Sequence, residues 1–170
     1  MFGGSCAWNT SGRRAAVVTA YVGLGANLGD RARTIGRAVA LLDATPGVDV
    51  VAVSALRQTD PVGYGDQPRF LNGVAAVETG LGPRELLDRL LAVERELGRV
   101  RGQGPRYGPR AIDLDLLLHG DAVVDEAGLV VPHPRLAERR FVLEPLWELA
   151  PELVLPDGRR VRDLLRTTLE

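Results

Sequence analysis

The order in which strand-like and helix-like segments follow one another constrains the fold of this chain more than any other feature. Strands are expected where β-branched and apolar residues form short runs between Gly and Pro, and helices where apolar residues recur three and four positions apart. The pattern predicts strands over 17–24, 48–57, 70–79 and 112–118, a helix between Asp30 and Thr45, and a second helix over 83–97. Strand, helix, strand, strand, helix, strand is the order of a ferredoxin-like split βαβ fold.

The predicted fold class is therefore α+β, with a mainly antiparallel sheet and both helices packed on one of its faces. Asp30 is the expected N-cap of the first helix, because its carboxylate can accept a hydrogen bond from a free N–H group of the first turn. A small extra hairpin is expected from 122–124 and 129–131, followed by short closing helices over 140–149 and 161–165.

Length and composition favour a single domain. A chain of 170 residues, 45% of them hydrophobic, can bury one sizeable core but has no room for a second domain. We expect residues 17–170 to form this domain. Residues 1–16 carry Gly, Ser and paired Arg without a long apolar stretch, so they are interpreted as a disordered tail or an over-long start, and not as a secretory signal.

The charge balance narrows the classes of partner. All 21 basic residues are Arg, and 22 acidic residues bring the formal net charge to −1, so no global field attracts nucleic acid or an anionic membrane. No segment approaches the ~18 successive apolar residues of a membrane span. The single Cys6 cannot form an intramolecular disulfide. We therefore expect a cytoplasmic protein without a nucleic-acid or membrane partner, in which any phosphate site is local.

The segment RAIDLDLLL, residues 110–118, is the most informative for chemistry. Side chains alternate along a strand, so Asp113 and Asp115 should emerge on one face while Ile112, Leu114 and Leu116 enter the core. Two carboxylates on one face repel each other unless a cation lies between them. One interpretation is ion pairing with neighbouring Arg side chains; the other is a magnesium site, because Mg²⁺ is held by one or two carboxylates together with water and phosphate oxygens.

A glycine-rich segment upstream of this strand is rich in arginine. Such a segment suits a flexible cationic flap over a polyphosphate, although a solvated run of charge has the same composition. The adjacent acidic pair favours the flap, because cations and acids brought together describe a metal and phosphate site. The four arginines concerned are Arg99, Arg101, Arg106 and Arg110.

Four further residues have a structural interpretation, and for two of them a binding role is equally open. Phe70 and Asn72 share a strand face, where an aromatic ring and a carboxamide could bind a heterocycle, but the same residues could be core and strand end. Phe141 on its own is interpreted as core. His133, fixed between Pro132 and Pro134, is interpreted as part of a surface turn.

Four separated segments together resemble the hydroxymethyldihydropterin pyrophosphokinase family. They are YVGLGANLGD, TDPVGYGDQPRFLNGVAAVET, GRVR with RYGPRAIDLDLLLHG, and VPHPRLAERRFVLEPLWELAPEL, and they cover most of residues 20 to 160 in order. The resemblance implies the ferredoxin-like α+β fold and an ATP-dependent diphosphokinase of folate biosynthesis. The implied reaction transfers pyrophosphate from ATP to 6-hydroxymethyl-7,8-dihydropterin and releases AMP.

The resemblance also implies roles for particular residues. Asp113 and Asp115 would bind two Mg²⁺ ions, and the pterin would stack between Phe70 and Phe141. The remaining residues on the pterin side would be Thr59, Asp60, Val62, Asn72 and Tyr107, the last standing where Trp is common in the family. Arg99 and Arg110 would neutralise charge on the migrating group, and the implied ATP contacts are Glu94, Arg101, Arg106, Arg110, His133 and Arg139.

Two rival functions remain open at this point. Ferredoxin-like sheets also serve as non-catalytic ligand-sensing modules, which would bind a ligand without consuming ATP. An ordinary kinase would transfer the γ-phosphate and release ADP. The acidic pair beside the arginine-rich segment disfavours the first rival, and only the family resemblance disfavours the second. A monomer with small-molecule substrates is expected.

Overall fold

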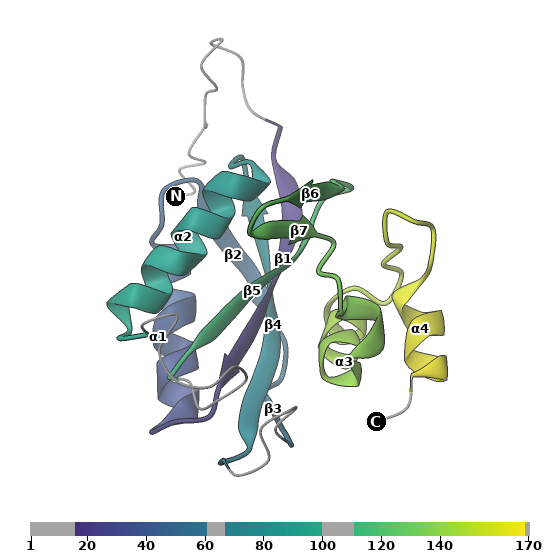
Figure 1. Cartoon of the computed structure of the whole chain (residues 1–170). Coiled ribbons are helices and arrows are strands. Elements are labelled where there is room, and N and C mark those ends of the chain that lie inside the picture. The colour runs from purple at the N-terminus through teal and green to yellow at the C-terminus, as the bar shows by residue number, and fades with distance from the viewer. Residues whose placement is uncertain (1–15, 61–66, 100–110, 169–170) are drawn as a thin grey trace.

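The computed structural model describes residues 16–60, 67–99 and 111–168, and it is built around one antiparallel sheet (Figure 1). The strand order is β2-β4-β1-β5, and β3 pairs with the same edge of β4 as β2 does. The strands are β1 (Val18–Ala26), β2 (Val48–Val53), β3 (Arg57–Thr59), β4 (Phe70–Thr79) and β5 (Asp113–His119). This order, with a helix after β1 and another after β4, is the predicted ferredoxin-like α+β arrangement.

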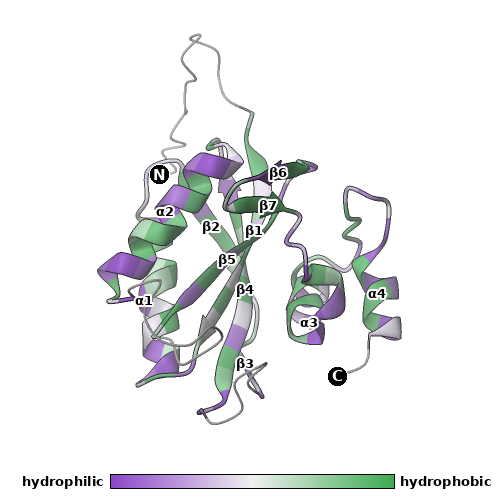
Figure 2. Ribbon diagram, in the orientation of Figure 1, coloured by the Kyte–Doolittle hydropathy of each residue, from purple (hydrophilic) through white to green (hydrophobic). Residues whose placement is uncertain are grey.

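Two helices, α1 (Arg31–Asp43) and α2 (Pro83–Glu96), cover one face of the sheet (Figure 1). The predicted N-cap is confirmed, because an Asp30 carboxylate oxygen accepts from the backbone N–H of Arg33 at 3.2 Å. The apolar stripes of both helices point at the sheet, and Figure 2 shows the strands as largely hydrophobic while the two helices also carry hydrophilic residues. The first core lies between these layers and includes Val22, Leu24, Ile35, Leu42, Val77, Leu86, Leu90 and Leu114.

The other face of the sheet carries a second, smaller core under α3 (Arg140–Leu149) and α4 (Val161–Thr167). The short 3₁₀ helix η1 (Leu136–Glu138) leads into α3. A register irregularity between β1 and β5 turns Leu117 and Leu118 both toward this second core, whereas Leu116 enters the first. Both faces of β5 are therefore covered at its C-terminal half, which explains its unbroken apolar run.

The hairpin and the closing helices were predicted close to their observed positions. The hairpin consists of β6 (Val124–Glu126) and β7 (Leu129–Val131) and is tied to α2 by the ion pair between Arg84 and Glu126 at 2.9 Å. α3 starts and ends at the predicted residues, and α4 runs two residues beyond its predicted end.

The prediction of one strand over 48–57 was wrong, because β2 ends at Val53 and β3 begins at Arg57. At the break the Ser54 hydroxyl replaces a backbone partner and accepts from the N–H of Val74 at 2.9 Å. Gly73 lies directly opposite, and a Cβ there would stand 2.7 Å from a methyl carbon of Leu56. Alternation alone could not reveal this side-chain-mediated interruption.

In the part of the chain that the structure describes, no helix is long and apolar enough to cross a membrane.

Replacing Leu90 with Ala tests the first core. Leu90 is fully buried, so its truncation leaves a cavity and should lower the free energy of unfolding by about 2–5 kcal/mol. The measurement is urea denaturation followed by circular dichroism. Leu28→Ala is the matched control, because Leu28 is 40% exposed and should cost less than about 1 kcal/mol. Equal losses in the two variants would contradict this assignment of the core.

Candidate active site

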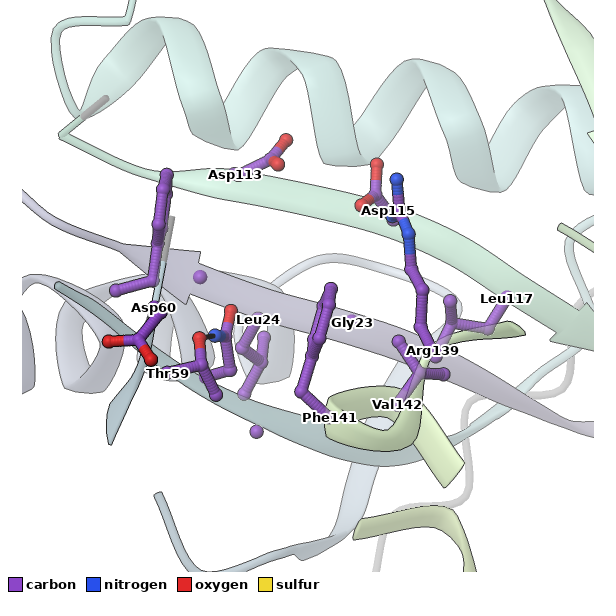
Figure 3. A pocket seen from close by; sticks show the side chains of 14 residues that line it. Gly23, Leu24, Thr59, Asp60, Asp113, Asp115, Leu117, Arg139, Phe141 and Val142 are labelled. Carbon is purple, nitrogen blue, oxygen red and sulfur yellow. Dashed lines mark hydrogen bonds between the residues drawn. The ribbon is translucent and has the colours of Figure 1, made fainter. Parts of the chain in front are cut away.

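A pocket lies where β1, β4 and β5 pass beneath the start of α3 (Figure 3). Its floor is the glycine pair Gly23 and Gly25 of β1, which leave the sheet surface open. A Cβ on Gly25 would lie 3.0 Å from the amide oxygen of Asn72, so this strand position needs glycine for the neighbouring side chain to lie flat. These two glycines belong to the GLG motif of the sequence, but the strand pattern alone did not show that they form the floor of a pocket.

The acidic pair stands over this glycine floor. Asp113 is paired across the sheet with Gly25 and Asp115 with Gly23, so no opposing side chain fills the space beside either carboxylate. Figure 3 shows both carboxylates projecting from β5 on the same side of the sheet. Leu114, between them, is 1% exposed in the first core, which confirms the predicted alternation.

Asp113 is held in position by a cluster of largely buried charged side chains, Glu94 and Arg99. The Glu94 side chain is only 2% exposed and accepts from the Leu114 N–H at 2.9 Å and from an Arg99 amino group at 2.8 Å. The same Arg99 nitrogen donates to Asp113 at 2.6 Å and to the Ile112 carbonyl at 3.1 Å. Because β5 is an edge strand, Glu94 satisfies a backbone donor that has no neighbouring strand.

The electrostatics of this cluster favour charged Arg99. Burial on its own would lower the pKa of the Arg99 guanidinium, but the charge and hydrogen bond of Asp113, followed by the charges of Glu94 and Asp115, outweigh it and raise that pKa. For Asp113 the ion-pairing interpretation is correct, because Asp113 pairs with Arg99. The cluster also leaves the pair directed into the pocket, as a metal site requires.

The aromatic and amide residues converge as predicted. Phe70 from β4 and Phe141 from α3 line the same pocket, and Phe141 also packs against the second core. The Asn72 side-chain amide donates to the hydroxyl of Thr59, which fixes the amide with its oxygen toward Gly25. The pocket thus offers two rings and an oriented carboxamide, a combination that suits a flat heterocycle with a polar edge.

Arg139 and His133 lie at the edge of the site. Arg139 lines the pocket, points toward Asp115 in Figure 3, and its guanidinium carbon is 5.5 Å from the centre of the Phe141 ring. His133 lines a neighbouring cavity instead. Burial, followed by the charge of Arg139, lowers the pKa of His133 below its ordinary value although Asp113 opposes the shift. Its Nδ1 accepts from the Arg135 N–H at 3.1 Å, so the neutral ring carries its proton on Nε2 and can donate from there.

The predicted site residues separate into three groups, apart from His133, which lines a different cavity. Those that line the common pocket are Thr59, Asp60, Phe70, Asn72, Asp113, Asp115, Arg139 and Phe141. Glu94 and Arg99 lie next to Asp113 in the buried cluster; the predicted contact of Glu94 with ATP and the predicted role of Arg99 at the migrating group remain predictions. Val62, Arg101, Arg106, Tyr107 and Arg110 lie outside the described residues.

The donor set fits Mg²⁺ rather than a softer metal. No group of three or more His, Cys, Asp and Glu side chains that could hold a metal occurs within 16–60, 67–99 and 111–168. Mg²⁺ does not need such a group, because one or two carboxylates suffice when water and phosphate oxygens complete its shell. Asp113 and Asp115 supply two carboxylates on one strand face of one pocket.

Comparison with known proteins gives a consistent family. Residues 21–151 match the family model described as 7,8-dihydro-6-hydroxymethylpterin-pyrophosphokinase. The chain belongs to this pyrophosphokinase family. A 2-amino-4-hydroxy-6-hydroxymethyldihydropteridine pyrophosphokinase of Pseudomonas aeruginosa is 50% identical over 145 residues, which are 85% of this chain and 88% of that protein. Its Bacillus subtilis counterpart is 47% identical over 134 residues, 79% of each chain.

Larger proteins contain a region similar to this pyrophosphokinase chain. The folic acid synthesis protein fol1 of Schizosaccharomyces pombe is 44% identical over 137 residues, which are 81% of this chain but 18% of that protein. A crystal structure of HPPK-DHPS in complex with substrates superposes with a TM-score of 0.69 at 12% identity. The match covers 89% of this chain and 43% of the solved one, so this chain spans less than half of that protein. At this identity the similarity confirms the fold alone.

Substitution of Glu94 tests the buried charge cluster. Glu94→Ala should lower the free energy of unfolding by about 3–5 kcal/mol, because it leaves the Leu114 N–H without its acceptor and removes one of the two carboxylates that pair with Arg99. Glu94→Gln should cost less, about 1–3 kcal/mol, because its amide oxygen can still accept from the Leu114 N–H. Urea denaturation measures both, with the exposed Glu96→Gln of the same helix as the control. A Glu94→Gln protein as stable as the unaltered chain would show that the cluster does not stabilise the fold.

Proposed function

We propose that this chain transfers a pyrophosphoryl group from ATP to the hydroxymethyl oxygen of 6-hydroxymethyl-7,8-dihydropterin, giving AMP and the pterin diphosphate in folate biosynthesis. Membership of the pyrophosphokinase family over residues 21–151 supports the reaction class and both substrates. The observation that supports the proposed residue roles is that the acidic pair and two aromatic rings line one and the same pocket.

The pterin would occupy the aromatic part of this pocket. Its flat ring system can stack between Phe70 and Phe141, and the oriented amide of Asn72 can pair with its polar edge beside Thr59 and Asp60. This binding mode would direct the hydroxymethyl group toward β5. Holding the acceptor oxygen in one place is a large part of catalysis in phosphoryl-type transfer, because the reaction depends on positioning and charge stabilisation.

Asp113 and Asp115, which line one pocket, would hold Mg²⁺, and two ions are proposed because the family resemblance implies two. When bound, Mg²⁺ supplies charge stabilisation at the phosphate oxygens. Arg99 keeps Asp113 oriented through a 2.6 Å ion pair, and Arg139 adds positive charge opposite Asp115. Arg110, Arg101 and Arg106 are proposed to contact the phosphates, Tyr107 and Val62 the pterin, and Glu94 and His133 the nucleotide side of the site.

The proposed enzyme acts as a monomer in the cytoplasm and needs no covalent protein intermediate. The deciding experiment is an assay with ATP, magnesium and 6-hydroxymethyl-7,8-dihydropterin in which chromatography resolves AMP, ADP and the pterin product. One AMP for each pterin diphosphate supports the proposal. ADP would indicate γ-phosphate transfer, and pterin binding without nucleotide consumption would indicate a ligand-sensing module.

Asp115→Ala should abolish most of the magnesium-dependent activity. Removing a group that organises charge at the reacting phosphates should lower the rate of AMP formation by at least about 100-fold, with little change in stability because Asp115 is half-buried at the pocket wall. Initial rates at saturating substrates measure the effect. Asp125→Asn, an exposed carboxylate of the β6–β7 hairpin, is the control and should retain full activity. Intact turnover in Asp115→Ala would sink the assignment of the metal site.

A further inference from the structure

The short strand β3 carries one wall of the pocket but is weakly supported by the sheet. Thr59, at its end, holds the Asn72 amide, and Phe70 pairs directly with Thr59 across the ladder. β3 has only three residues and pairs with β4 along one edge. Its link to β2 is interrupted at Ser54 to Leu56, where the regular ladder stops. An edge strand this short needs another contact to keep its position.

Glu148, near the end of α3, supplies such a contact. One of its carboxylate oxygens accepts from the backbone N–H of Ala55 at 2.7 Å, within the interruption between β2 and β3. The other oxygen accepts from the Arg57 guanidinium at 2.5 Å. The carboxylate therefore binds the start of β3 at two points, one of them backbone, from a helix 91 to 93 residues further along the chain.

The same helix carries the opposite wall of the pocket. Phe141, Glu144 and Glu148 recur at intervals of three and four residues, so they lie along one side of α3. Glu144 accepts from Arg140 at 2.7 Å and lies 4.0 Å from Arg57, which extends the contact toward Phe141. A second cavity of about 480 Å³ adjoins the pocket here and shares Thr59, Asn72 and Phe141 with it.

We propose that Glu148 is a positioning residue for the pterin: by clamping the start of β3 to α3 it sets the spacing between the Thr59–Asn72 wall and Phe141. This inference rests on the proposed function, since it assigns the pterin to that space. Glu148 is not among the residues that line the pocket. Glu148 would act on the pterin indirectly, through Thr59 of β3 and Asn72 of β4 on one side of the pocket and through α3 on the other.

The clamp is positional rather than a main source of stability. Arg57 and Glu148 have side chains 38% and 34% exposed, and ion pairs at such exposure contribute little to the free energy of unfolding. A hydrogen bond from a backbone N–H to a carboxylate is stronger and directional. That bond from Ala55, followed by the one from Arg57, holds the pKa of Glu148 below its ordinary value, so the carboxylate stays charged at neutral pH.

Steady-state kinetics of Glu148→Gln, Arg57→Met and the double variant test the clamp. Each single change should raise the KM for 6-hydroxymethyl-7,8-dihydropterin about fivefold, while the KM for ATP stays within about twofold, because only the pterin side loses its spacing. The double variant should raise this KM by less than the product of the two single effects, because both changes remove the Arg57–Glu148 contact, while only Glu148→Gln also weakens the bond from Ala55. Asp163→Asn is the control, an exposed acid whose ion-pair partners Arg162 and Arg166 belong to its own helix α4.

Three results would overturn the clamp: an unchanged KM for the pterin, equal rises in both KM values, or fully additive effects in the double variant. Thermal melts accompany the kinetics, since a purely structural role would lower Tm and the active fraction without separating the two KM values. Calorimetric binding of 6-hydroxymethylpterin to the same proteins keeps the two proposals distinct. If the unaltered chain forms no AMP, the proposed function fails. If Glu148→Gln binds the pterin more weakly than the unaltered chain does, that result still supports the clamp.

Discussion

The position of β5 depends on one buried carboxylate. β5 is the edge strand nearest α2, and its outward N–H at Leu114 would face the apolar core without a partner if Glu94 were absent. Glu94 satisfies that donor and at the same time holds Arg99, which in turn pairs with Asp113 around the edge of the sheet. The contact that supports the strand therefore also orients the acidic pair on its other face. The fold and the site depend on the same cluster, so a substitution in the cluster would affect both.

The elements of the fold could be predicted from the sequence because local patterns determine them. Val48, Phe70 and Pro83 begin their strands and helix as predicted, since apolar periodicity and turn residues act over a few positions. The alternation that placed Asp113 and Asp115 together is equally local. Glu94 was different: it sits at the end of an amphipathic stripe, where a charge is normally solvated. Its burial is explained by the edge N–H of a strand twenty residues later and by the ion pair with Arg99.

The interruption at Ser54 and the contact of Glu148 with Ala55 escaped prediction for a related reason. Both depend on a side chain replacing a ladder partner, and no periodicity records which backbone donor a side chain will satisfy. Phe141 packs against the second core, as expected for an aromatic residue taken alone, and also lines the pocket with Phe70 and Asn72, which its own segment could not show. The family resemblance supplied that pairing, because it carries information about contacts between distant segments that a single strand or helix does not contain.

A ferredoxin-like sheet with helices on one face leaves its other face open, and this open face is where the proposed chemistry lies. Glycines in β1 keep the middle of that face low, carboxylates on β5 and an amide on β4 stand on either side, and α3 closes it from above. The helix is held to the sheet by the second core and, at the pocket edge, by the Glu148 contact. The two helices of the basic fold cover one face of the sheet, whereas the added helix α3 supplies one wall of the pocket on the other face. A ligand-sensing sheet and a transferase can thus share the same first layer and differ in what covers the second face.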